Sequence, residues 1–146
     1  MIAHTIQLAL APVFVLVAIG NIMNILSQRL GRVVDRSRHL QSVHRETEGP
    51  EHDMIVREIR LIDRRIKLIS RAILTLVASG LTIGLTVSLL FLGDFFRVDL
   101  QQASAIVFII AIGLLMWALL LFMQETRAAT DALRIPEEYL ERHRQL

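Results

Sequence analysis

The stretch that decides the fold is Leu26–Ile73, LSQRLGRVVDRSRHLQSVHRETEGPEHDMIVREIRLIDRRIKLISRAI. Mostly apolar residues recur in each half of this stretch at alternating steps of four and three. The recurring positions are Leu26, Leu30, Val33, Ser37, Leu40 and His44, and then Ile55, Ile59, Ile62, Ile66, Ile69 and Ile73. These steps are the heptad pattern of a coiled-coil seam, so each half is predicted to be a helix that packs along one stripe.

The two stripes are mirror images about the dipeptide Gly49-Pro50. Counting outward from this point aligns Leu26 with Ile73, and the other stripe positions follow in the same order. An antiparallel helical hairpin requires this mirror registry. Glycine is typical of the position after a helix, and proline of the first turn of the next. We therefore predict a coiled-coil hairpin over residues 27–71, with Gly49 directly after the first helix.

The composition places this hairpin in a membrane protein. The chain has 146 residues, of which 53% are hydrophobic, and its mean hydropathy is +0.52. Three segments contain no Asp, Glu, Lys or Arg: Met1–Gln28, Ala72–Gly93 and Leu100–Gln124. Each is longer than the roughly 20 residues with which a helix crosses a bilayer. We predict an all-α polytopic membrane protein with three transmembrane helices.

The whole chain is predicted to be one membrane domain. Its parts are a first span at 5–26, the hairpin at 27–71, a second span at 72–92, an outer loop at 93–102, a third span at 103–123 and a tail at 124–146. The first segment has no basic n-region and no A-x-A site, so we interpret it as a retained span rather than a signal peptide.

The distribution of basic residues predicts the orientation. Residues 27–71 contain eleven Lys or Arg, and the tail contains four, whereas the outer loop contains only Arg97. Cytoplasmic segments of membrane proteins carry the excess of Lys and Arg. The hairpin and the C-terminus are therefore predicted to lie in the cytoplasm, and the N-terminus outside.

The first span carries a polar face that allows two interpretations. Its members share helical spacing and are four amide side chains and one aromatic ring: Gln7, Phe14, Asn21, Asn24 and Gln28. Polar amides in lipid are costly unless they are paired, so this face should point at protein or water. Helix packing is the simpler interpretation. The alternative is that these residues line a pore in an oligomer.

Two further sets of residues are candidate sites. Gly80, Gly84 and Ser88 form a ridge of small residues in the second span, which allows helices to approach closely. The densest charge cluster, just after the first span, supplies candidate lipid-binding or anion-binding residues: Arg29, Arg32, Arg36 and Arg38. Arginines near a membrane surface gain about 1 kcal/mol each from anionic lipids. The alternative is an ordinary solvated face beside the membrane.

The sequence argues against several classes of function. Without cysteine, disulfides and thiolate metal sites are excluded. No combination of nucleophile, base and orienting group is present, so we predict no enzyme activity and no cofactor. His44, Glu48, Glu51 and His52 gather at the hairpin tip, but turns are usually polar, so we predict no metal site there. The positive charge beside the spans indicates lipid rather than nucleic acid.

Several stretches resemble the domain-of-unknown-function 2721 family of bacterial membrane proteins. They are Leu8-Ala-Leu-Ala-Pro-Val-Phe-Val-Leu16, Arg29-Leu-Gly-Arg-Val-Val-Asp-Arg-Ser-Arg38 and Asp63-Arg64-Arg65, followed by the remaining spans in this order. The likeness covers about residues 5–130, and the arginine run is its most specific part. It implies a location in the bacterial inner membrane. It implies no activity.

Two functions are consistent with these features. The first is a homo-oligomeric channel or permeation unit, because three spans are too few to enclose a path within one chain. The first span would line the path, and the arginines would form a basic cytoplasmic ring that favours anions. The second is a membrane scaffold or adaptor that presents the hairpin to a cytoplasmic protein partner. The absence of charged residues within the spans favours the second, because ion paths often carry a charge.

Overall fold

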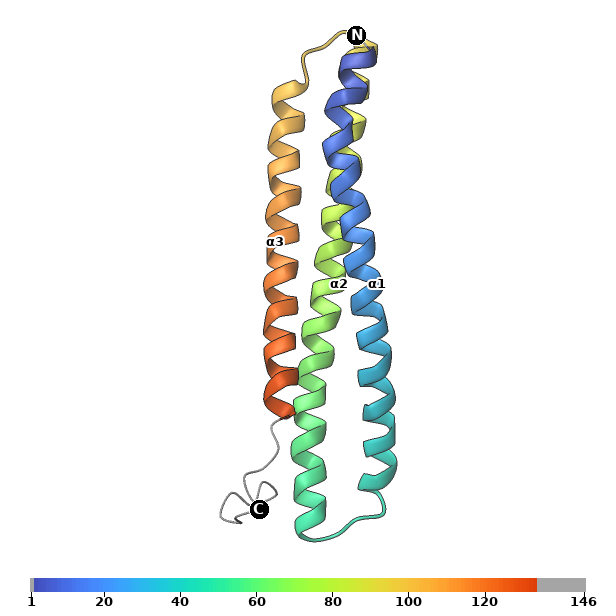
Figure 1. The fold of residues 1–146 in the computed structure, drawn as a ribbon, viewed down its shortest axis with the longest axis vertical. Helices are drawn as coiled ribbons and strands as arrows, with labels where there is room; N and C mark the ends of the chain where they lie inside the picture. The colour runs from blue at the N-terminus through green and yellow to red at the C-terminus, as the bar shows by residue number, and fades with distance from the viewer. Residues whose placement is uncertain (1, 134–146) are drawn as a thin grey trace, which may run out of the picture.

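The protein consists of three long α-helices joined by short connections. The computed structural model describes residues 2–133, in which α1 is Ile2–His44, α2 is Pro50–Phe96 and α3 is Gln101–Ala132 (Figure 1). All three helices are long and apolar enough to cross a membrane. The predicted all-helical architecture with three candidate spans is therefore confirmed.

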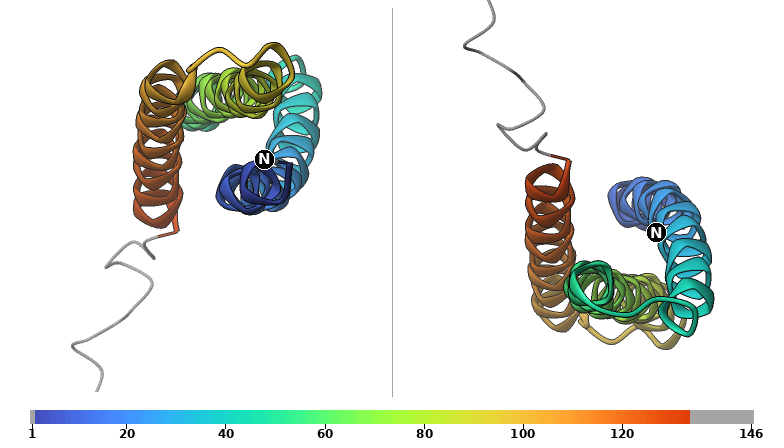
Figure 2. Two further views of the ribbon diagram at one scale, coloured as in Figure 1. Left: turned by 90° about the horizontal axis from the view of Figure 1, so that it is seen from above. Right: turned by 90° about the horizontal axis from the view of Figure 1, so that it is seen from below.

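The helices do not close into a bundle. α2 packs against both of its neighbours, whereas α1 and α3 scarcely contact each other. Viewed along the long axis, the three helices form a U with α2 at its base (Figure 2). One side of α2 is therefore left open between the flanking helices. Within residues 2–133, no path through the protein is enclosed by a single chain.

Buried residues recur every seven positions in all three helices. In α1 this stripe is Thr5, Pro12, Ile19, Leu26, Val33 and Leu40. α2 has two such stripes, which are Ile62, Ile69, Leu76 and Ile83, and Ala72, Ser79, Thr86 and Gly93. α3 has Ser104, Ala111, Ala118 and Glu125. The seven-residue repeat found in the hairpin sequence thus continues into the apolar segments. There, too, the residues at these steps are the ones that pack between helices.

The contact between α2 and α3 is built from small side chains. The Ser79 hydroxyl is fully buried and donates a hydrogen bond of 2.8 Å to the Ala111 carbonyl oxygen. Thr82 and Thr86 instead donate to carbonyl oxygens four residues earlier in their own helix. Small residues allow two helix backbones to approach closely. These hydroxyl groups therefore serve packing and satisfy their own hydrogen bonds.

The turn at the hairpin tip differs from the prediction in one respect. α1 ends at His44, five residues before Gly49, so Gly49 does not directly follow the first helix. Gly49 is the N-cap of α2, with φ 77° and ψ −145°, and Pro50 occupies the first turn. This backbone conformation is essentially restricted to glycine. Glycine is therefore needed to start α2 rather than to end α1.

The helix α3 extends beyond the predicted span 103–123 at both ends. The outer connection is short, because α2 continues to Phe96 and α3 begins at Gln101. At its other end, α3 continues without a break through Gln124 to Ala132. This continuation agrees with the sequence pattern after Gln124, which predicts a short helix to about Leu133. The remaining tail, residues 134–146, lies outside the described part of the chain.

Candidate functional site

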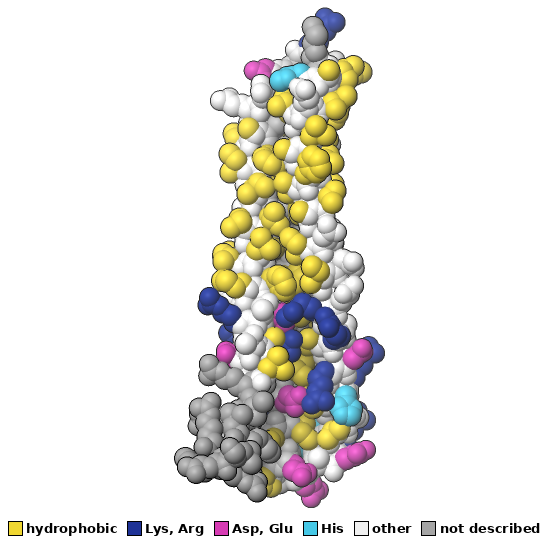
Figure 3. All heavy atoms as spheres, in the orientation of Figure 1, with side chains coloured by type: hydrophobic (Ala, Val, Ile, Leu, Met, Phe, Trp, Pro, Cys, Tyr) yellow, Lys and Arg dark blue, Asp and Glu magenta, His cyan; other side chains and the backbone are white. Residues whose placement is uncertain are grey.

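Glu125 is the centre of a charged cluster where the apolar part of the protein ends. Its side chain is 0% exposed, and it is the single fully buried charged residue among those described. On the face drawn in Figure 3, apolar side chains dominate the upper half, and most of the charged side chains lie in the lower half, toward the hairpin end. Glu125 therefore lies inside the protein at the level where charged residues begin.

Two arginines hold the Glu125 carboxylate from the other two helices. Arg29 of α1 donates from Nε and Nη2 to Oε2, at 3.0 and 2.6 Å. Arg65 of α2 donates from Nε and Nη2 to Oε1, at 3.1 Å each. The Arg29 guanidinium also lies 5.4 Å from the centre of the Phe122 ring on α3, within cation–π range. One residue from each helix thus meets in a single cluster, which we call the Glu125 clamp.

The clamp connects helices that otherwise hardly touch. α1 and α3 have very few contacts, and the Arg29–Glu125 pair joins them directly. Burial of a carboxylate costs several kcal/mol unless it is paired and hydrogen-bonded. Here each carboxylate oxygen accepts two N–H groups, which compensates that cost. The clamp therefore sets the separation of α1 and α3 at this end of the U.

The register in which α3 packs against α2 places Glu125 beside Arg65. Ser79–Ala111 and Arg65–Glu125 are contacts between α2 and α3 that lie 14 residues apart on both helices, which is two heptads. Glu125 is not among the site residues predicted from the sequence. Two signals were present. Arg29 and Glu125 are each the first charged residue after an apolar segment, and Glu125 follows Ala111 and Ala118 at seven-residue steps.

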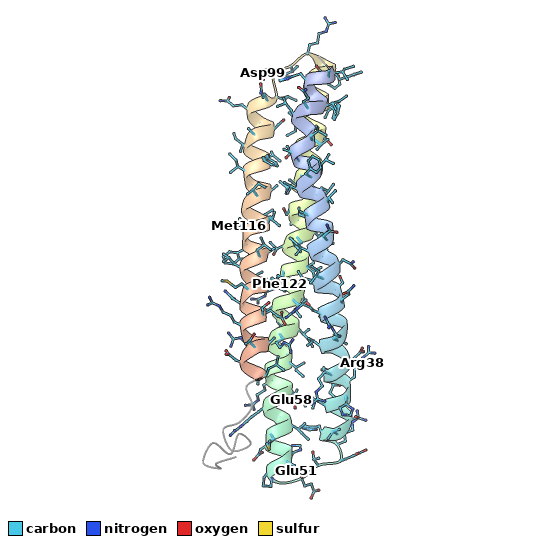
Figure 4. The ribbon with its side chains drawn as sticks, viewed as in Figure 1. Arg38, Glu51, Glu58, Asp99, Met116 and Phe122 are labelled. Carbon is cyan, nitrogen blue, oxygen red and sulfur yellow. The ribbon has the colours of Figure 1, made fainter. Side chains whose placement is uncertain are left out.

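The structure separates the four candidate anion-binding arginines. Arg29 belongs to the clamp, and Arg36 pairs with Glu58 across the hairpin, with Nη2 2.8 Å from Oε1. Arg32 is exposed and makes no ion pair with another residue of the described chain. Arg38 lies on the side of α1 that faces away from the other helices (Figure 4). Three of the four therefore lie toward one side, and Arg38 lies apart.

A cavity of about 320 Å³ lies beside the clamp. Its charged lining consists of Arg29, Arg32, Arg36 and Arg65, and we call it the arginine cavity. The rest of its lining is Val33, Ile62, Ala129 and Leu133. Arg38 does not line this cavity, whereas Arg65 of α2 does, although the sequence analysis named Arg65 only within the stretch Asp63-Arg64-Arg65 and not as a site residue. All three helices contribute to the cavity, with Ala129 near the end of α3 and Leu133 directly after that helix.

The predicted polar face of α1 points away from the packed helices. Gln7, Phe14, Asn21, Asn24 and Gln28 are all exposed, and Phe14 is 69% exposed. At 100° per residue, Asn21 lies about 200° around the helix from the buried Ile19. None of the four amides makes a side-chain hydrogen bond with another residue in the described range 2–133. Contacts within one chain thus leave this face without partners.

The predicted ridge of small residues is only partly used within the chain. A side chain at Gly80 would approach Leu16 of α1 to 3.6 Å, so α1 and α2 come close there. Gly84 and Ser88 are exposed, and no atom lies within 4 Å of a Cβ position at Gly84. The structure therefore places the first ridge residue against α1 and leaves the other two on the surface.

The hairpin tip holds a pair of histidines. The rings of His44 and His52 lie 4.3 Å apart, at an angle of 49°. His52 Nδ1 is buried without a hydrogen-bond partner in the described structure. Among residues 2–133, no group of three or more His, Cys, Asp or Glu side chains is arranged to hold a metal ion. The histidine rings pack together between the two helix ends of the tip.

Three long apolar helices, with charged clusters beyond their apolar parts, define a multi-pass helical membrane protein. Comparison with family models identifies it further. The model of the family described as "Protein of unknown function (DUF2721)" matches residues 9–135, and the chain belongs to this family. The resemblance seen in the sequence is confirmed. No curated protein matches the chain, and no solved structure matches it.

Proposed function

We propose that this protein is a homo-oligomer of the bacterial inner membrane that forms a channel or permeation unit around copies of α1. The N-terminus lies outside, and the hairpin and the C-terminus lie in the cytoplasm, as the distribution of Lys and Arg favours. The hairpin halves of α1 and α2 form a coiled coil on this side. The observation that carries the proposal is the exposed, unpaired amide face of α1.

The amide face requires a partner outside the chain. Asn21 lies eight residues before Arg29, which is about 12 Å along the helix and well within the apolar zone. An amide in hydrocarbon without a hydrogen-bond partner is destabilised by several kcal/mol. A second copy presents the same face, and the amides can then pair across the interface or face shared water. Association of copies through α1 therefore satisfies these groups.

A ring of copies with α1 inward encloses the path that a single U-shaped chain lacks. Its wall would be Gln7, Phe14, Asn21, Asn24 and Gln28. At the cytoplasmic mouth, Arg32 and Arg38 are not paired within the described chain, whereas Arg29 and Arg36 are partly neutralised by glutamates. The mouth is positively charged and favours anions.

The decisive experiment combines subunit number with conductance. Native mass spectrometry of the purified protein is expected to give an assembly of five or more copies, and planar bilayers are expected to show anion-selective currents. Asn21→Leu should alter the currents or the assembly. Leu81→Ala is the matched control, because Leu81 is 72% exposed on α2, away from the amide face. A monomer, or an assembled protein that stays silent in bilayers, would refute the channel.

A second candidate function is a membrane scaffold or adaptor that presents the hairpin to a cytoplasmic protein. The observation that favours it is the projection of the hairpin, since α1 continues 16 residues beyond Gln28, or about 24 Å. Photo-cross-linking from Glu48 at the tip should then capture a different protein. Deletion of that protein should give the same phenotype as deletion of the protein described here. Capture of further copies alone would count against the adaptor.

A further inference from the structure

We propose that the arginine cavity is a binding site for the phosphate group of an anionic phospholipid of the cytoplasmic leaflet. The assignment of the leaflet rests on the orientation in the proposed function. The cavity itself, its residues and its charge are properties of the single chain. The site differs from the basic face expected from the sequence, because Arg65 of α2 replaces Arg38 and α3 supplies one wall.

The cavity carries more positive charge than the chain neutralises. Four arginines line it, and two carboxylates pair with them, Glu125 with Arg29 and Arg65, and Glu58 with Arg36. The net charge of these four arginines and two glutamates is therefore +2. Arg32 is the lining arginine without an ion pair in the described chain. A single phosphate group would neutralise much of this excess.

The ion pairs beside the cavity also hold arginine N–H groups in place as hydrogen-bond donors for a phosphate. Arg29 and Arg65 use Nε and Nη2 to bind Glu125, and Arg36 uses the same two atoms to bind Glu58. These bonds do not use the N–H groups of Nη1 in any of the three. Arginine side chains that are already held by carboxylates lose less rotamer freedom when a ligand arrives. The cavity is therefore a partly preorganised receptor for oxygen acceptors.

The depth of the cavity favours lipid phosphate over free phosphate. Arg29 is the first charged residue after the apolar segment of α1, and Arg32 lies about 4.5 Å further along the helix. The headgroup region extends about 5–8 Å beyond the hydrocarbon core on each side. The cavity is thus level with lipid phosphates.

Native mass spectrometry of the full-length protein in detergent micelles tests this site. The probes are phosphatidylglycerol, phosphatidylcholine and inorganic phosphate. We expect the wild-type protein to retain phosphatidylglycerol in preference to phosphatidylcholine. Arg32→Gln should weaken this retention about fivefold or more, in line with about 1 kcal/mol per arginine at an anionic surface. Arg32 lies outside the clamp, so the variant is expected to fold.

The matched control is Arg38→Gln, which removes the same charge from the same helix outside the cavity. It should leave retention within about twofold of wild type, because exposed charges contribute little at a distance. Equal losses in both variants would overturn the site in favour of general surface charge. Equal retention of phosphatidylcholine would overturn the role of charge. Binding of inorganic phosphate without phosphatidylglycerol would overturn the assignment to lipid.

Failure of this proposal and failure of the proposed function are distinguishable. Retention in micelles depends neither on conductance nor on orientation in a cell. Orientation is measured separately by labelling Glu48→Cys with a membrane-impermeant thiol reagent, since the natural chain has no cysteine. If the protein retains lipid but its hairpin reacts with the reagent from outside the cell, the assignment to the cytoplasmic leaflet is wrong. The arginine cavity would still be a lipid-binding site.

Discussion

Replacement of the buried carboxylate of the Glu125 clamp, Glu125→Gln, should loosen one end of the protein. The glutamine amide is nearly the same size, but its single oxygen accepts from one arginine while its NH₂ group faces the donors of the other. Removing one partner of a buried ion pair costs about 3–5 kcal/mol. Arg29 and Arg65 are 24% and 23% exposed and can turn partly toward solvent or headgroups. We therefore expect a loss near the lower limit, about 3 kcal/mol.

The measurement is reversible unfolding in mixed micelles, with Asp63→Asn as the control. Asp63 also accepts from a basic residue, Lys67 at 2.7 Å, but both side chains are more than half exposed. The control should therefore lose about 0.5 kcal/mol or less. A loss of stability for Glu125→Gln no greater than that for Asp63→Asn would show that the clamp does not stabilise the protein.

A second measurement tests the effect of Glu125→Gln on the distance between α1 and α3 rather than on stability. α1 and α3 have few contacts, and the Arg29–Glu125 ion pair joins them directly, so Glu125→Gln should broaden the distribution of distances between them. Spin labels at Ile25→Cys and Gln124→Cys report this distance, because the natural chain has no cysteine. The distribution between α2 and α3 should stay narrow, since the small residues of that seam are unaffected. An unchanged distribution between α1 and α3 would show that the clamp does not position them.

Three further predictions follow from individual contacts. Arg29→Gln and Arg65→Gln should each lower the free energy of unfolding by about 1.5–3 kcal/mol, the range for a hydrogen bond to a charged group. In a double-mutant cycle with Glu125→Gln, the losses should be strongly non-additive. Additive losses would contradict a shared cluster. Gly93→Ala should destabilise by about 1–3 kcal/mol, because the new methyl group would lie 3.0 Å from the Val98 carbonyl oxygen. Gly113→Ala has open space and should be neutral or stabilising by thermal unfolding; similar losses in both would contradict the tight turn. Ser79→Ala should cost about 0.5–1.5 kcal/mol through its bond to Ala111, whereas Ser88→Ala, which loses only a bond within its own helix, should cost less; equal costs would argue against the α2–α3 contact.

The architecture could be read from the sequence because it depends on local patterns. A run of more than 20 uncharged residues specifies a spanning helix by its own length, and heptad spacing specifies which stripe of a helix is buried. Leu26, Val33 and Leu40 are indeed buried on α1, and Ile62 and Ile69 on α2. The turn was located for the same reason, although Gly49 proved to cap α2 rather than α1.

The polar face of α1 could also be read from the sequence, but not its surroundings. Helical spacing places Asn21 and Gln28 on one face whichever helices pack nearby. The exposure of that face depends on α2 packing against the opposite side, at Ile19 and Leu26. Another helix packed directly against that face would have buried the amides. Their unpaired state, on which the proposed function depends, therefore emerged only from the arrangement of the helices.

The sequence by itself determined three spans, a seven-residue packing repeat and a concentration of arginine beyond the first span. Only the tertiary structure decided that Glu125 lies between Arg29 and Arg65, and that Arg65 rather than Arg38 lines the arginine cavity. The physical reason is that spacing along a helix sets the angle of each side chain about its own axis. Which residue of another helix it meets depends on the order and register in which separate helices pack, and residues 96 positions apart are brought together only by that packing.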